Sequence, residues 1–378
     1  NCELCPVRTA RKEPSELRIN SIKINNLRNI RCADIEASKH LNCLYGDNGA
    51  GKTTVLEAML ILAKGRSFRT GQVGALIGPE ADQFLITAEI NHQDMSPVKV
   101  GVQRSRNEWQ ARRNGENISA LSDLAADFPL VLMEPNSHML ISGAPEVRRR
   151  YLDWSVFHVE HGFLPLWRRY AHAVKQRNAA LRMNDAEMSS SLEPALAKMG
   201  MQIDEYRQTR VNRMIDRVQE RLEALSPRVP KLSVRYQKGW SGDDLAAALA
   251  SSQARDLERG MTGPGPHRAD INISVKTHLA RECLSRGEQK LVAAAMLLAQ
   301  GDAIADAARR PVFLLDDLAS EFDGGIRKKV LSAALDLGGQ VWVTGTEPAT
   351  HTDMGITDAR MFHVKHGEIS HGSPLGLG

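Results

Sequence analysis

The chain has 378 residues, about two and a half times the ~150 residues of a common domain, so its length predicts two domains. Hydrophobic residues make up 42% and charged residues 25%, which excludes the disordered, collagen-like and disulfide-scaffold classes. The net charge of +4 is weakly basic, so it permits an anionic partner without requiring one.

Targeting and membrane signals are not evident in this sequence. No run of about eighteen apolar residues occurs, and the first residues are polar and charged, so we expect neither a membrane span nor a secretory signal. The five cysteines form an odd, scattered set, which is typical of a reducing cytoplasm. Cys2 and Cys5 make a lone CxxC pair in a predicted tail over residues 1–16; because a second pair or a histidine is missing, we do not favour a metal site.

The first part of the chain combines predicted strands with one helix. Alternating or β-rich apolar segments predict strands from Leu17 and at 41–45, 84–90, 98–104 and 109–113, the last two forming a hairpin around 105–107. An apolar segment over 54–64, ended by Gly65, predicts a helix. These elements predict an α/β unit.

After residue 144 the pattern changes to long helices and then returns to α/β. The expected elements are a helix at 145–182, a polar turn at 184–191, a helix at 192–225, a strand at 232–237, a helix at 245–250, a Gly/Pro-rich loop at 260–266, a strand at 270–275, a helix from Ser285, and strands at 312–315 and 340–344. The continuous apolar segment at 312–315 is typical of a buried parallel strand.

The segment from Gly46 to Thr53 fits the pattern GxxxxGK[ST] between a predicted strand and a predicted helix. Glycines let successive backbone N–H groups surround phosphate oxygens, and the helix N-terminus adds its positive end. Lys52 then supplies charge to the β- and γ-phosphates and Thr53 a hydroxyl to Mg²⁺. A plain glycine-rich turn is the alternative. The candidate nucleotide-binding residues are Gly46, Asp47, Asn48, Gly49, Ala50, Gly51, Lys52, Thr53 and Thr54.

Two carboxylates, Asp316 and Asp317, end the predicted buried strand. In a Walker-B interpretation, Asp316 supports Mg²⁺ beside Thr53, and Asp317 orients or deprotonates the attacking water. Acidic residues are common at strand ends, so the interpretation depends on Lys52, which lies 264 positions upstream. Because both motifs must share one site, the residues between them predict an insertion that leaves near residue 145 and returns near 262.

The segment 284–289 (LSRGEQ) resembles the LSGGQ signature of ABC ATPases, and 318–323 (LASEFD) resembles their D-loop. In that superfamily the signature completes the nucleotide site of the opposite subunit, which would give Ser285 and Gly287 that function. The alternative is that Ser285 is an ordinary helix N-cap. The usual switch histidine is missing, because 343–346 offers only hydroxyls and His351 lies too far along the chain.

Four less general signatures accompany these motifs: 26–29 (NLRN), 65–69 (GRSFR), Glu134-Pro135 leading into 143–153 (GAPEVRRRYLD), and 265–270 (GPHRAD). With them, the stretch from 17 to 369 resembles the RecF family of bacterial DNA replication and repair proteins, which are SMC-like ABC ATPases. Ala269 departs from the family pattern, which usually has an acidic residue there.

The resemblance implies an α/β fold: a P-loop ABC-type ATPase head with mixed sheets and an inserted, mainly helical arm. We expect a head over 17–144 and 262–369, an arm over 145–261, and tails at 1–16 and 370–378. It also implies a cytoplasmic, weak DNA-dependent ATPase that binds ATP and Mg²⁺, dimerises on ATP binding and binds single- and double-stranded DNA. Such a protein acts with RecR and RecO to help load RecA at gaps during recombination, replication, repair and the SOS response.

Several residues have an open interpretation. SMC-like ATPases place an arginine near nucleotide or DNA in the region of Arg66 and Arg69, and we take Arg69 as the nucleotide-site candidate; a solvated surface arginine is the alternative. His267 is either a packed loop histidine or a residue near the nucleotide or an interface. Asp317 stands where ABC ATPases usually have glutamate, and its shorter side chain predicts slow hydrolysis, which suits a switch.

DNA binding could use either of two basic segments. Residues 144–182 contain eight basic residues against three acidic ones, and these eight are Arg148, Arg149, Arg150, Arg168, Arg169, Lys175, Arg177 and Arg182. A solvated face is the alternative. The second segment is the hairpin with Arg104, Arg106, Arg112 and Arg113. No recognition motif is evident, so we expect backbone contacts. The aromatic residues Tyr151, Trp154 and Phe157 are three apart, which favours core packing.

Two other functions compete with this interpretation. In the nucleotide-binding subunit of an ABC transporter the Walker motifs lie much closer together, without a long helical arm. A scaffold with an inactive ATPase would not need the intact Lys52, Asp316 and Asp317.

Overall fold

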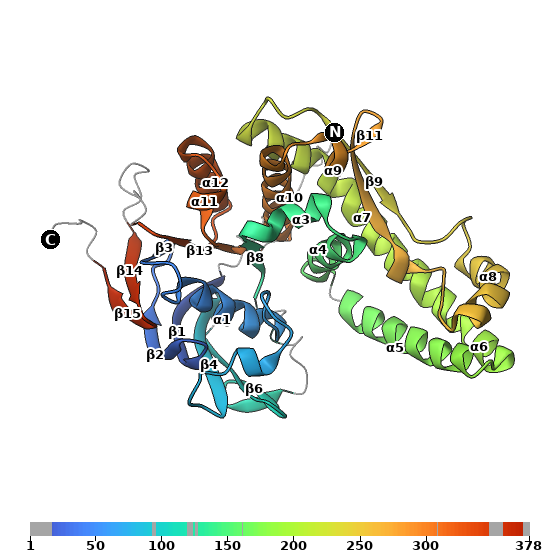
Figure 1. Cartoon of the computed structure of the whole chain (residues 1–378), viewed down its shortest axis with the longest axis horizontal. Coiled ribbons are helices and arrows are strands. Elements are labelled where there is room, and N and C mark those ends of the chain that lie inside the picture. The colour runs from blue at the N-terminus through green and yellow to red at the C-terminus, as the bar shows by residue number, and fades with distance from the viewer. Residues whose placement is uncertain are drawn as a thin grey trace, which may run out of the picture.

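The computed structural model describes residues 17–92, 96–118, 124, 128–160, 162–307, 309–347 and 358–372. The predicted N-terminal tail with Cys2 and Cys5, the residues from 373 onward, and His351 lie outside the described residues. Figure 1 shows two sheets and the P-loop helix on one side of the molecule and a group of long helices on the other.

The first sheet has six antiparallel strands in the order β2-β1-β4-β5-β6-β7. Its strands are β1 (Leu17–Leu27), β2 (Ile30–Glu36), β4 (Gln83–His92), β5 (Val98–Ser105), β6 (Trp109–Arg113) and β7 (Glu116–Ile118). Alternate residues of β1, including Ile22 and Ile24, are buried, since successive side chains of a strand point to opposite faces. The predicted hairpin between β5 and β6 is confirmed.

The second sheet has the order β15-β14-β3-β13-β12-β8 and is parallel except for its edge pair, β14 and β15. Its strands are β3 (Leu41–Tyr45), β8 (Leu130–Met133), β12 (Val312–Leu315), β13 (Val341–Gly345), β14 (Ala359–Lys365) and β15 (Glu368–His371). All four residues of β12 are buried, as its continuous apolar sequence predicts. Helix α1 (Lys52–Lys64) packs against strands of both sheets.

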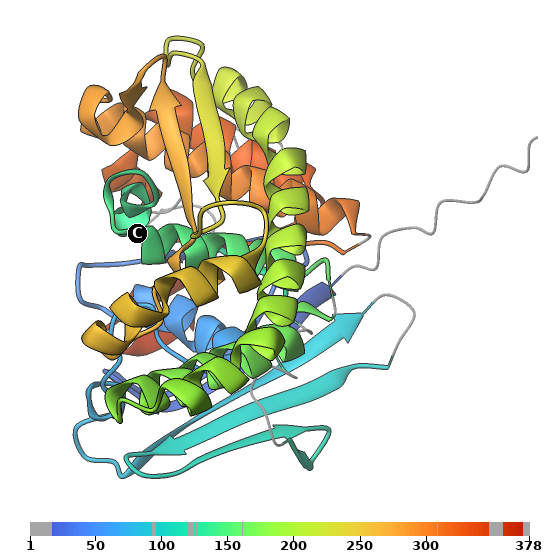
Figure 2. The same cartoon turned by 90° about the vertical axis from the view of Figure 1, so that its right-hand side faces the viewer.

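The helices on the other side of the molecule differ from the sequence prediction in three places. They are α4 (Pro145–Phe157), α5 (Phe163–Arg182), α6 (Ala186–Ser191), α7 (Glu193–Leu225) and α8 (Leu245–Arg259), and Figure 2 shows α7 running upright beside α5 and α8. The single helix predicted over 145–182 is wrong. Pro165 has no N–H to continue a helix from residue 161, but it is tolerated in the first turn of a new one, α5.

The other two differences concern the ends of helices. The predicted polar turn at 184–191 contains α6, whose first turn is capped by Asp185 through a hydrogen bond from the Met188 N–H. Helix α8 continues to Arg259, nine residues beyond the predicted end, and stops at Gly260, which has a left-handed φ of 63°.

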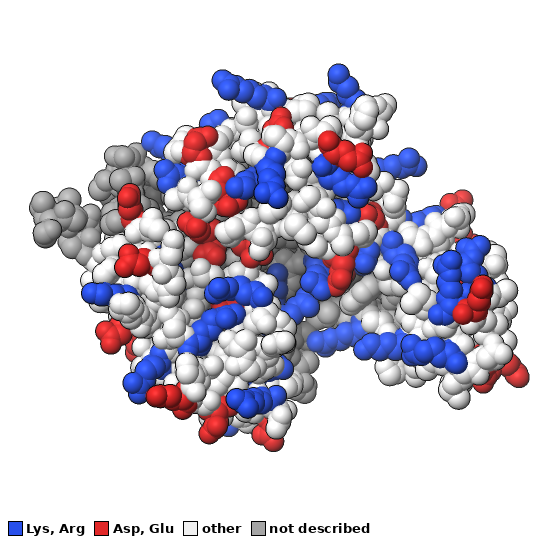
Figure 3. All heavy atoms as spheres, in the orientation of Figure 1, with Lys and Arg blue, Asp and Glu red and all other residues white. Residues whose placement is uncertain are grey.

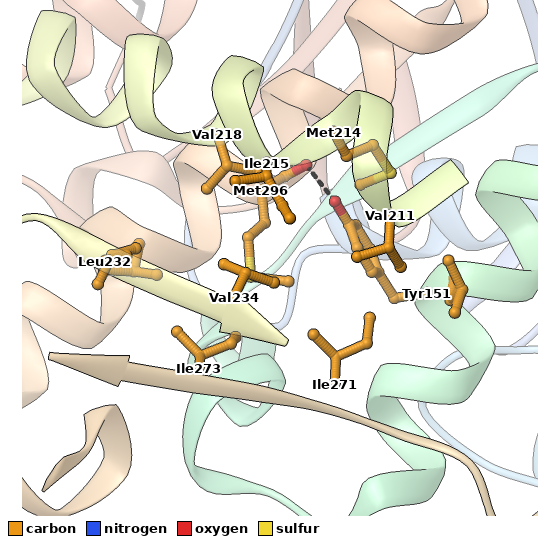
Figure 4. Close-up of a pocket in the computed structure, with 12 residues that line it drawn as sticks. Tyr151, Val211, Met214, Ile215, Val218, Leu232, Val234, Ile271, Ile273 and Met296 are labelled. Atoms are coloured by element: carbon orange, nitrogen blue, oxygen red, sulfur yellow. Dashed lines mark hydrogen bonds between the residues drawn. The ribbon is translucent and has the colours of Figure 1, made fainter. Parts of the chain in front are cut away.

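A third, small sheet has the order β11-β10-β9, made of β9 (Leu232–Gln237), β10 (Asp270–Val275) and β11 (His278–Leu279). It packs with α4, α7 and α10 (Arg286–Asp306) around an apolar cavity of about 20 Å³ (Figure 4). Tyr151 donates its hydroxyl hydrogen bond to the Met296 carbonyl at 2.6 Å at one side of this cavity. Strand β9 of the predicted arm thus pairs with β10 of the predicted head; the boundary near residue 261 stays a prediction.

Buried arginines join the helices to the small sheet and the loop before it. Arg148 forms a two-bond ion pair with Asp270, with N···O distances of 2.7 and 3.0 Å. Arg207 does the same with Asp153 at 2.8 and 3.1 Å. Arg177, fully buried, pairs with carboxylates of α7 and α8. Arg148 and Arg177 are therefore not part of a DNA-facing surface, which corrects that part of the basic-segment prediction.

Two remaining interpretations are decided by packing. Tyr151 is buried and Trp154 stacks on Phe157, so the core interpretation of these aromatic residues is confirmed. His267 Nδ1 lies 2.7 Å from the Tyr170 hydroxyl and its Nε2 lies 3.1 Å from the Thr262 carbonyl. His267 is therefore a packed loop histidine, and its burial lowers its pKa to about 4.

Candidate nucleotide site

The P-loop connects β3 to α1 through residues 46–51, as the motif predicts. Gly46 has a φ of 145°, and a Cβ atom on it would lie 2.1 Å from the Val364 carbonyl oxygen, so only glycine fits. Gly49 (φ 79°) has open space around the position of a Cβ, and Gly51 (φ 120°) precedes the first residue of α1. The loop therefore presents its backbone beside a helix N-terminus, as an anion site requires.

Lys52 folds back across this loop. Its Nζ donates hydrogen bonds to the carbonyl oxygens of Gly46 at 2.6 Å and Asp47 at 2.8 Å. Burial lowers the pKa of Lys52, while the nearby carboxylates of Asp317, Asp316 and Asp47 raise it. The ammonium group is therefore held at the loop by carbonyl oxygens and lies within the field of both Walker-B carboxylates.

Asn29, which lies next to the P-loop, has a structural function that the sequence alone did not assign. Its side-chain amide donates to the carbonyl oxygens of Gly49 at 3.1 Å and Ala50 at 3.0 Å. The preceding Arg28 forms an ion pair with the fully buried Glu57 of α1. The signature at 26–29 therefore fixes the P-loop and its helix to β1 and β2. In the sequence, the presence of this signature was the only indication that these residues have such a function.

Asp316 is brought to Thr53 by the order of the parallel strands. Strands β3 and β12 both flank β13, so their carboxyl ends meet at one edge of the sheet. The Thr53 hydroxyl lies 2.9 and 3.2 Å from the two carboxylate oxygens of Asp316. Burial raises the pKa of Asp316, and hydrogen bonds from Thr344 and Thr53 oppose this effect. The predicted pairing of the two motifs is present in the structure.

Thr344, at the end of β13, is a site residue whose function the sequence did not reveal. Its hydroxyl donates to Asp316 Oδ1 at 2.7 Å and accepts a hydrogen bond from the Asp317 N–H at 2.9 Å. It therefore fixes both Walker-B residues with one buried group. In the sequence, the only indication of this function was that Thr344 ends a predicted strand in a segment rich in hydroxyl groups.

The valine variant of Thr344 is a direct test of this arrangement. We expect Thr344→Val to slow ATP hydrolysis roughly tenfold while ATP binding stays nearly unchanged, because a hydrogen bond to a charged group is worth ~1.5–3 kcal/mol. Single-turnover hydrolysis and nucleotide titration measure the two effects separately. The matched control is Thr346→Val, since Thr346 is exposed two residues later. Equal rates for the two variants would contradict the assignment.

Asp317 follows Asp316 with a left-handed backbone, φ 50° and ψ 46°. Its carbonyl accepts a hydrogen bond from Ser320 at 2.9 Å, so it starts the short helix α11 (Leu318–Glu321). Asp323 then caps α12 (Gly324–Asp336), accepting a hydrogen bond from the Ile326 N–H at 3.0 Å. The segment that resembles a D-loop therefore leaves the site as a tight turn that ends in a capped helix.

The signature segment is an exposed helix N-terminus. The Ser285 side chain accepts from the Glu288 N–H, and Glu288 bonds back to the Ser285 N–H, which forms a capping box at the start of α10. A Cβ atom on Gly287 would meet nothing within 4 Å. Within the described part of the chain, neither residue has a hydrogen bond to the P-loop.

Arg66 and Arg69 differ in their surroundings. The charge of Arg69 partly opposes the raised pKa values of Asp316 and Glu134, so this exposed guanidinium lies near the Walker-B end of the site. Burial lowers the pKa of Arg66, and its charged neighbours are Arg150 and Glu146. Of the two candidates, only Arg69 lies near the Walker-B carboxylates; its function at the nucleotide stays a prediction.

Glu134 is a third residue whose function the sequence analysis missed. It directly follows β8, whose Met133 pairs with Leu315 of β12, so it lies beside Asp316. Burial, and then the charge of Asp316, raise the pKa of Glu134 to about 7, while Lys64 and Arg69 oppose the shift. A carboxyl group that titrates near neutral pH beside a Walker-B aspartate is a candidate functional group. The sequence indicated Glu134 only through the Glu134-Pro135 pair, one of the four signatures of the RecF resemblance.

The residues of the site fit a magnesium nucleotide. Mg²⁺ is usually held by one or two protein oxygens together with substrate phosphates, and Thr53 with Asp316 supplies that donor set. No cluster of three or more His, Cys, Asp or Glu side chains suited to a metal occurs among the residues with described positions. No helix in the described ranges has both the length and the apolar character needed to cross a membrane.

Comparisons with known proteins agree with this geometry. The family described as RecF/RecN/SMC N terminal domain matches residues 18–370. The DNA replication and repair protein RecF of Pseudomonas aeruginosa (strain LESB58) is 38% identical over 95% of this chain and 99% of its own. The RecF of Xanthomonas euvesicatoria pv. vesicatoria (strain 85-10) is 39% identical, with 94% and 98% covered.

Solved structures show the same fold. The structure of the recombination mediator protein RecF-ATP in the RecFOR pathway is similar with a TM-score of 0.86 and 23% identity, covering 95% of this chain and 99% of that one. The Smc head domain derived from Pyrococcus furiosus has a TM-score of 0.57 and 15% identity, covering 94% and 96%. The family assignment excludes the transporter-subunit alternative and confirms the expected α/β ABC-type ATPase head with a helical arm. The chain belongs to the RecF family of DNA replication and repair proteins, which are ATP-binding ABC-type ATPases.

Proposed function

We propose that this protein is an ATP-gated DNA clamp that functions in recombinational repair and replication. Two copies enclose ATP and Mg²⁺, retain DNA while the nucleotide is intact, and separate after slow hydrolysis. The observation that carries this proposal is an asymmetry within one chain. Thr53 and Asp316, which are 263 positions apart in the sequence, are joined by a hydrogen bond. Ser285 and Gly287, in contrast, are exposed and form no hydrogen bond to the P-loop within the described residues.

The asymmetry supports a site that is completed by a second copy. An exposed helix N-terminus with a glycine offers N–H groups and a positive dipole end to an anion, which would compete with Glu288 for the Ser285 hydroxyl. Here that terminus belongs to α10, a 21-residue helix that is long enough for a full dipole effect. In a dimer, the γ-phosphate held by one P-loop would meet the Ser285 and Gly287 of the other copy.

Each residue of the proposed site has a distinct function. Lys52 supplies positive charge to the β- and γ-phosphates, Arg69 adds a second charge, and Thr53 with Asp316 would hold Mg²⁺. Asp317 orients the attacking water, and Thr344 positions both carboxylates. The bound metal would neutralise charge that develops on the phosphates during transfer.

Slow hydrolysis is expected from Asp317. Its side chain is one methylene shorter than the glutamate common at this position, and its N–H is fixed to Thr344, so the carboxylate reaches less far toward a water molecule. We propose that the ATPase acts as a switch. A steady-state turnover of many ATP per second by the protein alone would contradict this.

The dimer proposal is tested by an arginine at the signature. We expect Ser285→Arg to leave ATP binding by the monomer intact and to abolish ATP-dependent dimers, because the added side chain blocks the exposed N-terminus of α10. Sedimentation velocity with and without ATP measures the dimer, and a fluorescent-nucleotide titration measures binding. Ser251→Arg, at an exposed position of α8, is the matched control. Loss of both properties in Ser285→Arg alone would overturn the assignment across subunits.

The DNA-binding surface is proposed to lie on α5. This helix contains no Asp or Glu, and its exposed basic positions Arg168, His172, Lys175 and Arg182 recur at steps of three, four and seven, which places them on one face. Figure 3 shows Lys and Arg gathered along the edge of the helical region where Figure 1 draws α5. The rival hairpin carries Glu108 and Glu116 beside its arginines, so its positive charge is weaker.

The α5 surface predicts a specific salt dependence. We expect the combined change Arg168→Ala, Lys175→Ala and Arg182→Ala to lower the slope of log K against log salt by about 2 to 3, since each lost phosphate contact removes ~0.7–0.9. DNA binding is measured in ATP over a series of salt concentrations, and ATP-dependent dimerisation should be unchanged. The control is Arg106→Ala with Arg112→Ala in the hairpin. If the control lowered the slope more than the α5 variant, the DNA-binding surface would be the hairpin and not α5.

The protein partners are proposed from similarity to related proteins alone. A related structure is described as belonging to the RecFOR pathway, so we propose RecR and RecO as partners and RecA as an indirect one. Co-sedimentation of the full chain with RecR in the presence of ATP and gapped DNA tests this; absence of a complex under these conditions would contradict it.

A further inference from the structure

A second cluster of arginines lies apart from the nucleotide site, between α7 and α10. A cavity of about 90 Å³ is lined on the α7 side by Arg210, Arg213 and Arg217 and on the α10 side by Asp306. The spacing of three and four residues places the arginines on one face of α7. A cavity of this size holds several water molecules, and its lining carries three positive charges against one negative charge.

Arg210 is the unusual member of the cluster. It is only 7% exposed, and its Nε is buried without a hydrogen-bond partner. Within the described ranges it forms no ion pair, whereas other buried arginines do: Arg177 and Arg207 each pair with carboxylates. A buried charge is costly unless it is paired and hydrogen-bonded. Arg210 therefore has an unmet requirement for an acceptor.

The electrostatics around Arg210 favour an added anion. Burial lowers its pKa most, and the charge of Arg213 lowers it further, while Tyr151, Asp306 and Glu160 act in the opposite direction. Asp306 is exposed and makes no ion pair with the arginines in the described structure, so it compensates Arg210 only at a distance. Arg217 pairs with Glu220 at 3.1 Å on the solvent side.

We propose that Arg210, Arg213 and Arg217 form a binding site for one phosphoryl group, distinct from the P-loop. Three guanidinium groups on one face, one of them buried, match a tetrahedral oxyanion that accepts several hydrogen bonds. A carboxylate, with two oxygens, is matched by a single arginine fork. The phosphoryl group comes either from free phosphate or from the backbone of a nucleic acid, which share this chemistry.

The site also has a structural consequence. It lies where α7 packs against the C-terminal part of α10, at Ala299, Ala303 and Asp306, whereas the signature segment is at the other end of that helix. An anion bound there would join the two helices through Arg210 and would replace a repulsion between Arg210 and Arg213 by a shared acceptor. Occupancy is thus expected to stabilise the contact between the long helix and the signature helix.

Chemical modification mapped by mass spectrometry tests the proposal. The Lys52→Ala background removes the contribution of the P-loop, and phenylglyoxal then modifies accessible arginines of the full chain. With phosphate in place of chloride at constant ionic strength, we expect modification of the exposed Arg213 and Arg217 to slow about tenfold when the site is ~90% occupied. Arg228, exposed beyond the end of α7, is the internal control and should be unaffected. Equal modification rates with and without phosphate or oligonucleotide would overturn the proposal.

The two sources of phosphate are distinguished in the same assay. A single-stranded oligonucleotide without terminal phosphates is compared with inorganic phosphate. Protection by phosphate alone identifies a site for a free anion, and protection by the oligonucleotide identifies a site for a nucleic-acid backbone; both support the shared chemistry.

A variant separates binding from a structural function of Arg210. In phosphate-free buffer we expect Arg210→Met to unfold at the same denaturant concentration as the parent or a higher one, because replacing an unpaired buried charge with an apolar side chain of similar size is neutral or stabilising. Phosphate should raise the midpoint of the parent protein and leave that of Arg210→Met unchanged. A destabilised variant that still responds to phosphate would overturn the assignment.

Discussion

Replacing Lys52 with alanine is expected to abolish ATP-dependent dimerisation and, with it, the retention of DNA. The Nζ of Lys52 is held by two P-loop carbonyl oxygens and faces the Walker-B carboxylates, so it is the positive charge inside the cradle. Hydrogen bonds to charged groups contribute ~1.5–3 kcal/mol each, so loss of the side chain should weaken ATP binding roughly 100-fold or more.

The measurement uses nucleotide titration together with sedimentation velocity on gapped DNA, with and without ATP. Lys39→Ala, at an exposed position just before β3, is the matched control, because it removes the same charge outside the site. ATP-dependent dimers of Lys52→Ala at the parental nucleotide concentration would contradict the clamp proposal. Loss of dimers in the control as well would indicate a general charge effect.

Replacing Arg177 with alanine is expected to lower the free energy of unfolding of the helical region by about 3–5 kcal/mol, since breaking a buried pair leaves uncompensated charges. Arg177 Nη1 lies 2.7 Å from Asp256 and 3.1 Å from the Thr262 hydroxyl, and its Nη2 lies 2.7 Å from Glu193. Asp256 is 1% exposed, so its carboxylate would stay buried without its cation.

Hydrogen exchange of peptides from α5 and α8 measures this loss locally, which avoids assuming that the whole chain unfolds in one step. Arg182→Ala is the control, because Arg182 lies on the same helix but is exposed, and a surface change of this kind is within about 0.5 kcal/mol. Similar protection in both variants would show that the buried network does not hold α5 in place.

Much of the nucleotide site could be predicted from local sequence. The P-loop is a contiguous segment whose glycines are required by backbone geometry, as Gly46 against Val364 shows, so its position follows from its own residues. The buried strand β12 has a continuous apolar sequence, and Asp316 and Asp317 at its end were predicted as functional for the same reason. The spacing of these motifs also predicted an insertion between them.

Other features depended on contacts between distant segments. Thr344 and Glu134 became site residues only because β13 and β8 flank β12, which no local pattern of hydroxyl or carboxyl groups reveals. The break between α4 and α5, in contrast, had a local signal that the prediction overlooked, namely Pro165 in the first turn of α5.

The sequence by itself determined the position of the candidate nucleotide site, because the P-loop and the Walker-B strand are local motifs with their own backbone and burial requirements. Tertiary structure alone decided which arginines are buried and which are free. Arg148 and Arg177 are paired with carboxylates 122 and 79 residues away, whereas Arg210 has burial without a partner. An arginine side chain has the same chemistry in every case; its function depends on whether the fold brings an acceptor to it.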